Sequence, residues 1–145
     1  MCGIAGILSF RGPLGPDADL RLQAAAASLA HRGPDDEGFY RAGEVGLAFR
    51  RLSILDLAGG HQPMGNEDGT IQVIFNGEIY NYRELTARLK ASGHVFKTRS
   101  DTEVLVHLYE EVGDEFATQL RGMFAIALWD ARRQRLLLVR DRLGI

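Results

Sequence analysis

The only cysteine of this 145-residue chain stands at position 2, directly behind the initiator methionine. A small second residue allows an aminopeptidase to remove Met1, and Cys2 would then carry a free α-amine beside its thiol. Because an α-amine titrates at about 7.7–8.0 and a thiol near 8.5, the amine can draw off the thiol proton at neutral pH, with a bridging water as relay. Cys2 is therefore a candidate nucleophile with its own base. The alternative is a small, buried, apolar side chain.

The elements that would position Cys2 begin immediately after it. Apolar residues and two glycines over residues 4–10 predict a buried strand, which Gly12-Pro13 and Gly15-Pro16 end. Residues 19–30 then predict a helix capped by Asp17 or Asp19. Further elements predicted in this half are a polar turn over 31–38, a hairpin of 39–40 with 45–49 that turns at Ala42-Gly43, a loop over 58–63 and a turn over 66–69.

The second half predicts a strand, helices and a hairpin. An apolar strand over 71–75 runs into Asn76-Gly77-Glu78. Asn81, with Glu84 three residues later, predicts the N-terminal cap of a helix. Ser100 and Glu103 have the same spacing and predict the cap of a second helix. The remaining predictions are helix ends at Gly93 and Gly113, a short strand over 95–98, a short helix over 114–120, and a hairpin of strands 124–129 and 136–139.

Helices combined with antiparallel hairpins predict a layered α+β domain. With 145 residues the chain has the length of one domain, and 46% apolar residues are enough for a core. The sequence stops directly after a predicted strand, so we expect a truncated C-terminal edge and further residues beyond Ile145.

Charge, cysteine content and hydropathy exclude several classes of protein. A net charge of −2 argues against nucleic acid and acidic membranes as partners, and a single cysteine excludes an internal disulfide. The sequence has neither a basic leader nor an apolar run near 18 residues, so we expect neither a signal peptide nor a membrane-spanning helix. We therefore expect a cytoplasmic protein. His31, His94 and His107 are not at ligand spacing in the sequence, so no metal is expected here.

Seven ordered motifs across the whole chain resemble the class II, N-terminal-nucleophile glutamine amidotransferases. They are Met1-Cys2-Gly3-Ile4-Ala5-Gly6, His31-Arg32-Gly33-Pro34-Asp35, Arg51-Leu52-Ser53-Ile54, Phe75-Asn76-Gly77-Glu78-Ile79-Tyr80-Asn81, Ser100-Asp101-Thr102-Glu103, Arg121-Gly122-Met123-Phe124-Ala125 and Arg140-Asp141-Arg142-Leu143-Gly144. The third and fourth motifs are similar to the branch of glutamine-hydrolysing asparagine synthetases. Sugar-phosphate amidotransferases usually have an Arg-Trp pair in place of the third motif and a sequence of the Asn-Gly-Ile type in place of the fourth.

The resemblance implies a fold and a reaction. The fold would be a four-layer α/β/β/α sandwich of two antiparallel sheets between helices, with residues 1–145 as a glutamine amidotransferase type-2 domain. The reaction would be hydrolysis of the glutamine side-chain amide to glutamate and ammonia. A synthetase domain, which these 145 residues do not contain, would then use ATP and Mg²⁺ to amidate aspartate with this ammonia. In paralogues the acceptor would be another molecule. No cofactor is expected in this domain.

The resemblance also implies roles for particular residues. Cys2 matches the nucleophile, and Asn76 and Gly77 match the oxyanion hole. Arg51 matches the site for the glutamine carboxylate, and Glu78 and Asp101 match the sites for its ammonium. The backbone of Arg51, Leu52, Ser53, Ile54 and Leu55 would line the same pocket. Arg32 and Asp35 are assigned structural or pocket-wall roles, and His61 and Gln62 receive none.

Each of these residues also has a structural explanation. Arg51 could face water at a strand end, Asn76-Gly77 could form a turn and Glu78 a solvated loop acid, and Asp101 could cap a helix. Two further functions therefore stay open. One is a non-catalytic module that binds glutamine or a synthetase partner, and the other is an amide hydrolase for a different substrate. L-glutamine and a synthetase domain, in the same or a separate chain, are the expected partners, and a homodimer is possible.

Overall fold

A computed structural model describes residues 2–52 and 60–144. The elements in chain order are β1 (Gly3–Leu8), α1 (Ala18–Ser28), β2 (Asp36–Ala42), β3 (Val45–Arg51), β4 (Met64–Gly65), β5 (Ile71–Ile79), α2 (Tyr82–Ala91), α3 (Glu103–Val112), the 3₁₀ helix η1 (Gly113–Gln119), β6 (Gly122–Asp130) and β7 (Arg135–Arg140).

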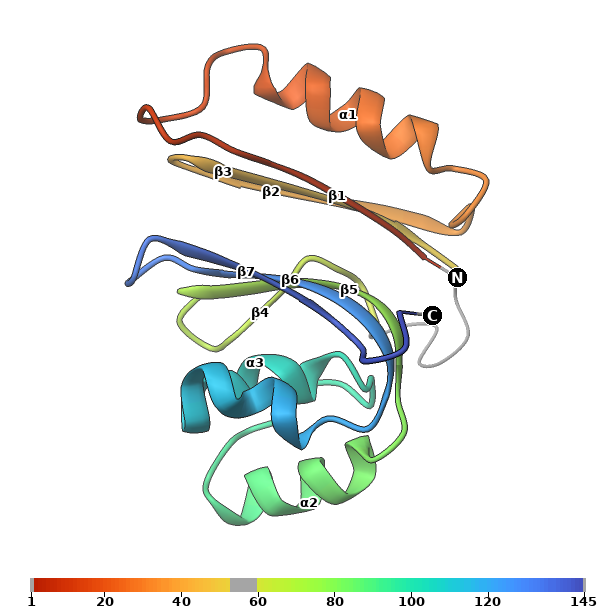
Figure 1. Ribbon diagram of the computed structural model, residues 1–145, viewed down its shortest axis with the longest axis vertical. Helices are drawn as coiled ribbons and strands as arrows, with labels where there is room; N and C mark the ends of the chain where they lie inside the picture. The colour runs from red at the N-terminus through yellow and green to blue at the C-terminus, as the bar shows by residue number, and fades with distance from the viewer. Residues whose placement is uncertain (1, 53–59, 145) are drawn as a thin grey trace.

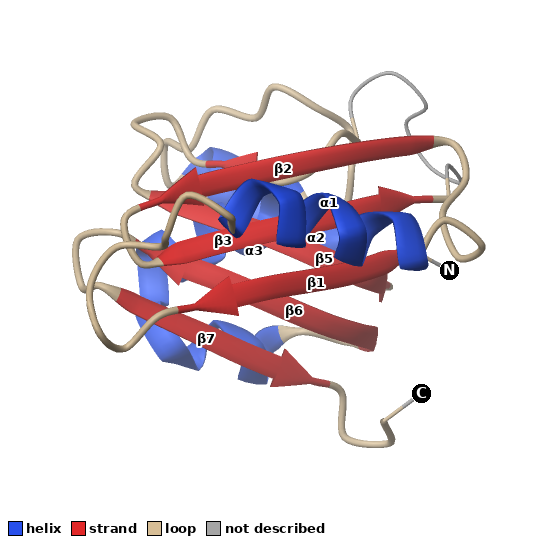
Figure 2. Cartoon of the chain, turned by 90° about the horizontal axis from the view of Figure 1, so that it is seen from above, coloured by secondary structure: helices blue, strands red, loops and turns tan. Residues whose placement is uncertain are grey.

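Two antiparallel sheets are stacked face to face between helices, as Figure 1 shows. One sheet has the strand order β1-β3-β2, and α1 lies across its outer face (Figure 2). The other has the order β4-β5-β6-β7, and α2 and α3 cover its outer face (Figure 1). This arrangement confirms the expected four-layer α/β/β/α sandwich.

Side chains of a central strand point alternately to the second sheet and to the covering helix. On β3, Val45, Leu47 and Phe49 are buried in a cluster with Ile74 and Trp129 of the second sheet. Successive side chains of a strand point to opposite faces, so the intervening residues of β3 face α1. Gly46 and Ala48 are small because α1 packs closely on them: a Cβ on Gly46 would lie 2.7 Å from the Leu22 side chain. A second apolar cluster fills the space under α2 and α3.

The strand predicted over residues 95–98 is wrong. This segment is irregular, because a side chain takes the backbone donors that a strand would pair. The Glu103 carboxylate accepts hydrogen bonds from the N–H groups of Lys97 and Thr98, both at 2.7 Å. Glu103 is also the first residue of α3, which begins after Thr102, so the predicted cap at Ser100 is two residues too early.

Asn81 does precede α2, but its side chain does not cap the helix. Its Nδ2 donates to the Gln119 carbonyl at 2.9 Å, and its Oδ1 accepts from the Arg121 N–H at 2.9 Å. Asn81 therefore ties the start of α2 to the segment that leads into β6.

Three smaller differences concern strands. β1 is an edge strand with partly exposed residues, and Phe10, expected within it, lies outside and is 92% exposed. β2 begins at Asp36, inside the predicted polar turn. β4, which was not predicted, has only two residues and pairs with β5. Within residues 2–52 and 60–144, none of the helices combines the length and apolar character that a membrane crossing requires.

Candidate active site

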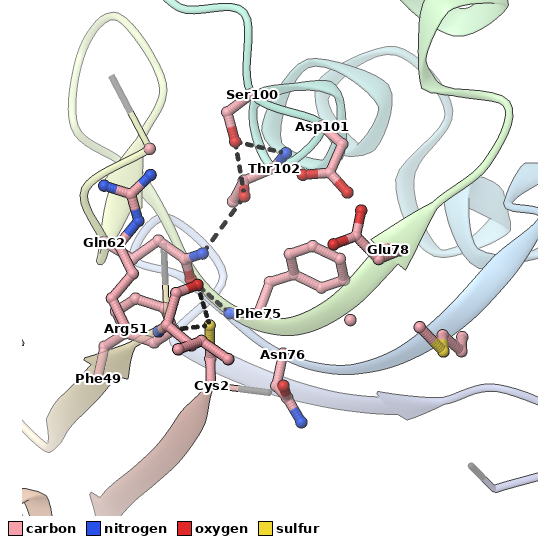
Figure 3. A pocket seen from close by; sticks show the side chains of 14 residues that line it. Cys2, Phe49, Arg51, Gln62, Phe75, Asn76, Glu78, Ser100, Asp101 and Thr102 are labelled. Carbon is pink, nitrogen blue, oxygen red and sulfur yellow. Dashed lines mark hydrogen bonds between the residues drawn. The ribbon is translucent and has the colours of Figure 1, made fainter. Parts of the chain in front are cut away.

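One cavity opens where the ends of β1 and β3 meet β5 and the segment before α3 (Figure 3). It holds about 570 Å³ of space when its open mouth is included. Seven predicted site residues line it: Cys2, Arg51, Leu52, Asn76, Gly77, Glu78 and Asp101. The predicted Ser53, Ile54 and Leu55 lie outside the described residues.

Cys2 stands at the start of β1 and is held beside the end of β3. The pairing of Gly3 with Arg50 brings Cys2 next to Leu52, whose N–H donates to the Cys2 sulfur at 3.4 Å. Such an interaction strengthens when the sulfur carries negative charge. Arg32 Nε donates to the Cys2 carbonyl at 3.1 Å, which supports a structural role for this arginine.

The two arginines at the end of β3 have different environments. Arg50 is partly buried, donates to the Gly33 carbonyl at 2.9 Å and pairs with the exposed Glu37 at 2.7 Å. Arg51 is only 6% exposed, so the alternative of a solvated side chain is wrong for it. The Asp35 N–H donates to the Arg51 carbonyl at 3.0 Å, which holds this end of β3 in place.

Asn76, Gly77 and Glu78 lie within β5, so the alternative of an Asn-Gly turn is wrong. Gly77 faces Phe124 of β6 in the register of the sheet. A Cβ there would lie 2.0 Å from the Met123 carbonyl oxygen, and φ is 153°, so only glycine fits. The Asn76 amide is in the cavity wall, and its buried Oδ1 has no hydrogen-bond partner among the described residues.

Glu78 and Asp101 bring two carboxylates to the same part of the cavity (Figure 3). Burial raises the pKa of Glu78 above its ordinary value, and the charge of Asp101 raises it further. Burial also raises the pKa of Asp101, although hydrogen bonds to its carboxylate act in the opposite direction. One of these comes from the Ile79 N–H at 2.9 Å, so Asp101 binds β5 rather than simply capping α3. A cation placed near both carboxylates would relieve their repulsion.

Gln62 also lines the cavity, although sequence patterns assign it no role. It is 4% exposed, and its Oε1 accepts from the Phe75 N–H of β5 at 2.6 Å. Its Nε2 donates to Thr102 Oγ1 at 3.3 Å, just before α3. The backbone carbonyl oxygen of Gln62 packs against β2 so closely that a Cβ on Gly38 would lie 1.8 Å from it. Gln62 thus joins both sheets and α3, and a glutamine in a loop carries no local signal for such a position.

The neighbouring His61 does not line the cavity. Its Nδ1 lies 2.7 Å from Asp36 Oδ2 at the start of β2. Burial raises the pKa of Asp36, but the hydrogen bond to His61 and nearby charges outweigh it and leave the pKa below its ordinary value. This pair fastens the loop that carries Gln62 to the three-stranded sheet.

Comparisons with known proteins identify the family of this chain. The family described as glutamine amidotransferase domain matches residues 1–145. The chain is 53% identical to "Asparagine synthetase [glutamine-hydrolyzing] 2" of Bacillus subtilis and 44% identical to "Asparagine synthetase [glutamine-hydrolyzing] 1" of Arabidopsis thaliana. Both alignments cover all of this chain, but only 19% and 24% of those proteins. The chain thus spans about a fifth to a quarter of the length of these relatives.

A solved structure supports the fold independently. The glutamine phosphoribosylpyrophosphate amidotransferase from B. subtilis matches 97% of this chain and 38% of its own, with a TM-score of 0.69 and 21% identity. At this identity the likeness establishes the fold alone. Since the family match extends over every residue, the chain belongs to the glutamine amidotransferase domain family.

Proposed function

We propose that this chain hydrolyses the side-chain amide of L-glutamine, with Cys2 as the nucleophile. The observation that carries the proposal is the cavity itself, which has a thiol, a buried arginine and two carboxylates in its wall. In Figure 3 the Cys2 sulfur and the two carboxylates occupy separate parts of that wall. A molecule with a reactive amide at one end and charged groups at the other fits such an arrangement.

The charged end of glutamine would be recognised by complementary groups. Arg51 offers a planar, permanently charged fork for the α-carboxylate. Glu78 and Asp101 offer two carboxylates for the α-ammonium, and the raised pKa of both side chains supports this role, because a bound cation would offset their repulsion. Leu52 would add backbone contacts, and we retain Ser53, Ile54 and Leu55 for the same wall as a proposal from the sequence.

The chemistry would start at Cys2 once Met1 has been removed. The α-amine takes the thiol proton, sulfur bonds to the amide carbon, and the carbonyl electron pair moves onto oxygen. The Asn76 amide N–H and the Gly77 backbone N–H would hold this oxyanion. When it collapses, the C–N bond breaks and the amine's proton leaves with ammonia. Water then attacks the thioester carbon, releases glutamate and restores the thiol.

The fate of the ammonia is the finer part of the proposal. The relatives' names, asparagine synthetases that hydrolyse glutamine, support its use to make asparagine. The resemblance of the sequence motifs adds the proposal that a synthetase domain, in the same or a separate chain, amidates aspartate with ATP and Mg²⁺. An asparagine-synthetase-like paralogue with another acceptor is the second candidate. A reducing cytoplasm is the proposed location, because a nucleophilic thiol must remain reduced. A homodimer remains a prediction from the sequence.

The experiment is glutamate release from glutamine, with the Cys2→Ala variant as control and with intact mass reporting whether Met1 has been removed. We expect release only from the unchanged protein, and only when Met1 is absent. Equal release by Cys2→Ala would contradict the proposal. Saturable glutamine binding without release would favour the non-catalytic module.

A further inference from the structure

Two histidines that are far from ligand spacing in the sequence meet on the outer side of the second sheet. His94 follows α2, and His107 lies on α3 with Glu110 one turn later. Glu110 Oε2 lies 3.2 Å from His107 Nδ1 and 3.7 Å from His94 Nδ1. One donor atom from each of the three residues lies within 4.8 Å of the others. None of the three lines the cavity that holds Cys2.

These distances are close to those of a metal centre. Donor atoms about 2.0–2.1 Å from a tetrahedral zinc ion are roughly 3.3–3.4 Å apart. The two contacts of Glu110 fall near this value, and the two histidine donors, which lie within 4.8 Å of each other, would have to close to it. Two imidazoles and one carboxylate are a donor set that suits zinc and related divalent transition metals.

A hydrogen bond holds Glu110 in orientation, and a carboxylate faces the second ring nitrogen of each histidine. Asn66 Nδ2 donates to the second Glu110 oxygen, Oε1, at 2.8 Å. His107 Nε2 lies 3.7 Å from Glu103 Oε1, and His94 Nε2 lies 4.0 Å from Glu111 Oε2. A carboxylate facing the second ring nitrogen of a histidine is the usual support of a metal-bound imidazole.

The surroundings of His107 call for a cation. The residue is 2% exposed, and Nε2 has no hydrogen-bond partner among the described residues. Carboxylates face both ring nitrogens: Glu103 at Nε2, and Glu110 with Glu67 at Nδ1. A neutral imidazole has a proton on only one nitrogen, so the other lone pair would point at a carboxylate. Among the residues that the structure describes, the ion pairs of these acids and of Glu111 are all with His94 or His107.

We propose that His94, His107 and Glu110 bind one divalent transition metal ion, with zinc as the best match, through His94 Nδ1, His107 Nδ1 and Glu110 Oε2. Glu67, whose Oε1 lies 3.8 Å from His107 Nδ1, or water completes the coordination. This reverses the expectation of no metal, which rested on sequence spacing alone. The ion would fasten the segment between α2 and α3 to α3, and Glu103 extends that link to the backbone of Lys97 and Thr98.

The test titrates Co²⁺ and then Zn²⁺ into purified, chelator-treated protein that carries Cys2→Ala, because the Cys2 thiol could itself bind metal. We expect one Co²⁺ per chain, ligand-field absorption of nitrogen and oxygen ligands, and displacement by Zn²⁺. At one hundred times the dissociation constant, Zn²⁺ should raise Tm by roughly 5–10 °C.

Matched variants in the same background keep the proposal falsifiable. His94→Ala and Glu110→Gln should weaken Co²⁺ binding by more than the roughly 10–100-fold that loss of an outer partner costs. His61→Ala, which removes a histidine outside the cluster, should leave it unchanged. Melting without metal checks that each variant folds. Absence of one-to-one binding, or binding unaltered in both cluster variants, would overturn the proposal.

Discussion

The two walls of the active-site cavity carry opposite charges and are built differently. The wall from the three-stranded sheet uses the ends of β1 and β3, where Cys2 and Arg51 stand. The other wall uses the middle and end of β5 and the segment before α3, where Asn76, Glu78 and Asp101 stand. Neither sheet alone has both the thiol and the carboxylates, so the site depends on the apolar packing that joins the sheets.

The two walls are therefore sensitive to different kinds of substitution. Residues at strand ends can change side chain without disturbing a ladder of backbone hydrogen bonds. Gly77 lies inside the ladder between β5 and β6, against the Met123 carbonyl. The second wall also carries repulsion, because burial and proximity raise the pKa of Glu78. We therefore expect substitutions that shift the backbone, and substitutions that change charge, to affect stability and activity most in the wall that contains β5.

The largest effect should come from Gly77→Ala. Its Cβ would lie 2.0 Å from the Met123 carbonyl oxygen, so β5 must shift and the proposed oxyanion donor moves with it. Glutamate release should fall by at least about 10²–10³-fold, and Tm should fall as well. The matched control is Gly43→Ala in the β2–β3 turn, where φ is 52° and nothing lies within 4 Å. Unchanged activity in Gly77→Ala would show that β5 does not place a catalytic group.

The first wall can be tested with a change that preserves charge. Arg51→Lys replaces a planar fork with a point charge, so KM for glutamine should rise by about 10–100-fold with a smaller change in kcat. Arg50→Lys, at the neighbouring position outside the cavity, should alter KM by less than about threefold. Steady-state kinetics on both variants decides the point, and equal KM values would remove Arg51 from the glutamine site.

The second wall can be loosened at Gln62, whose side chain joins β5 to the segment before α3. Gln62→Leu leaves the Phe75 N–H without its acceptor and Thr102 without a donor, which should destabilise the protein by about 1–3 kcal/mol. KM should rise because Thr102 and Asp101 share the segment before α3. Denaturant melts and kinetics measure the two effects, with Gln23→Leu on the exposed face of α1 as control. A variant as stable and active as the control would show that the loop position does not need this side chain.

Sequence patterns located most of this site, but not the contacts that join its parts. The motif residues Cys2, Arg51 and Asp101 were predicted together, and the structure brings them to one cavity. Local patterns failed where one side chain serves a distant backbone. Glu103 captures the N–H groups of residues 97 and 98, and Gln62 reaches β5 and Thr102. Spacing rules see neighbours along one helix or strand, so they cannot anticipate such bonds.

The smallest expected effect concerns stability and pH. The folded-state pKa of Glu78 and Asp101 lies above the ordinary values of 4.5 and 3.8. The folded protein therefore holds more protons on these groups than the unfolded chain, and their contribution becomes less favourable as pH rises through that window. Glu78→Gln should raise Tm at pH 7 by roughly 1–4 °C while weakening glutamine binding.

Thermal melts of the unchanged protein and Glu78→Gln from pH 4 to 7 compare the two slopes, roughly across the window in which raised carboxyl groups titrate. The advantage of the variant should shrink toward acid. An advantage that is constant with pH would mean that repulsion between the carboxylates does not destabilise this wall.

The most direct test of the two-wall account changes the substrate and leaves the protein intact. Ammonia release would be measured from glutamine, from the analogue without the α-amine and from the analogue without the α-carboxylate. The account predicts that each analogue loses at least about tenfold in kcat/KM, because a charge-assisted hydrogen bond contributes about 1.5–3 kcal/mol. Comparable turnover of all three amides would contradict recognition by opposite charges and would favour an amide hydrolase with another substrate.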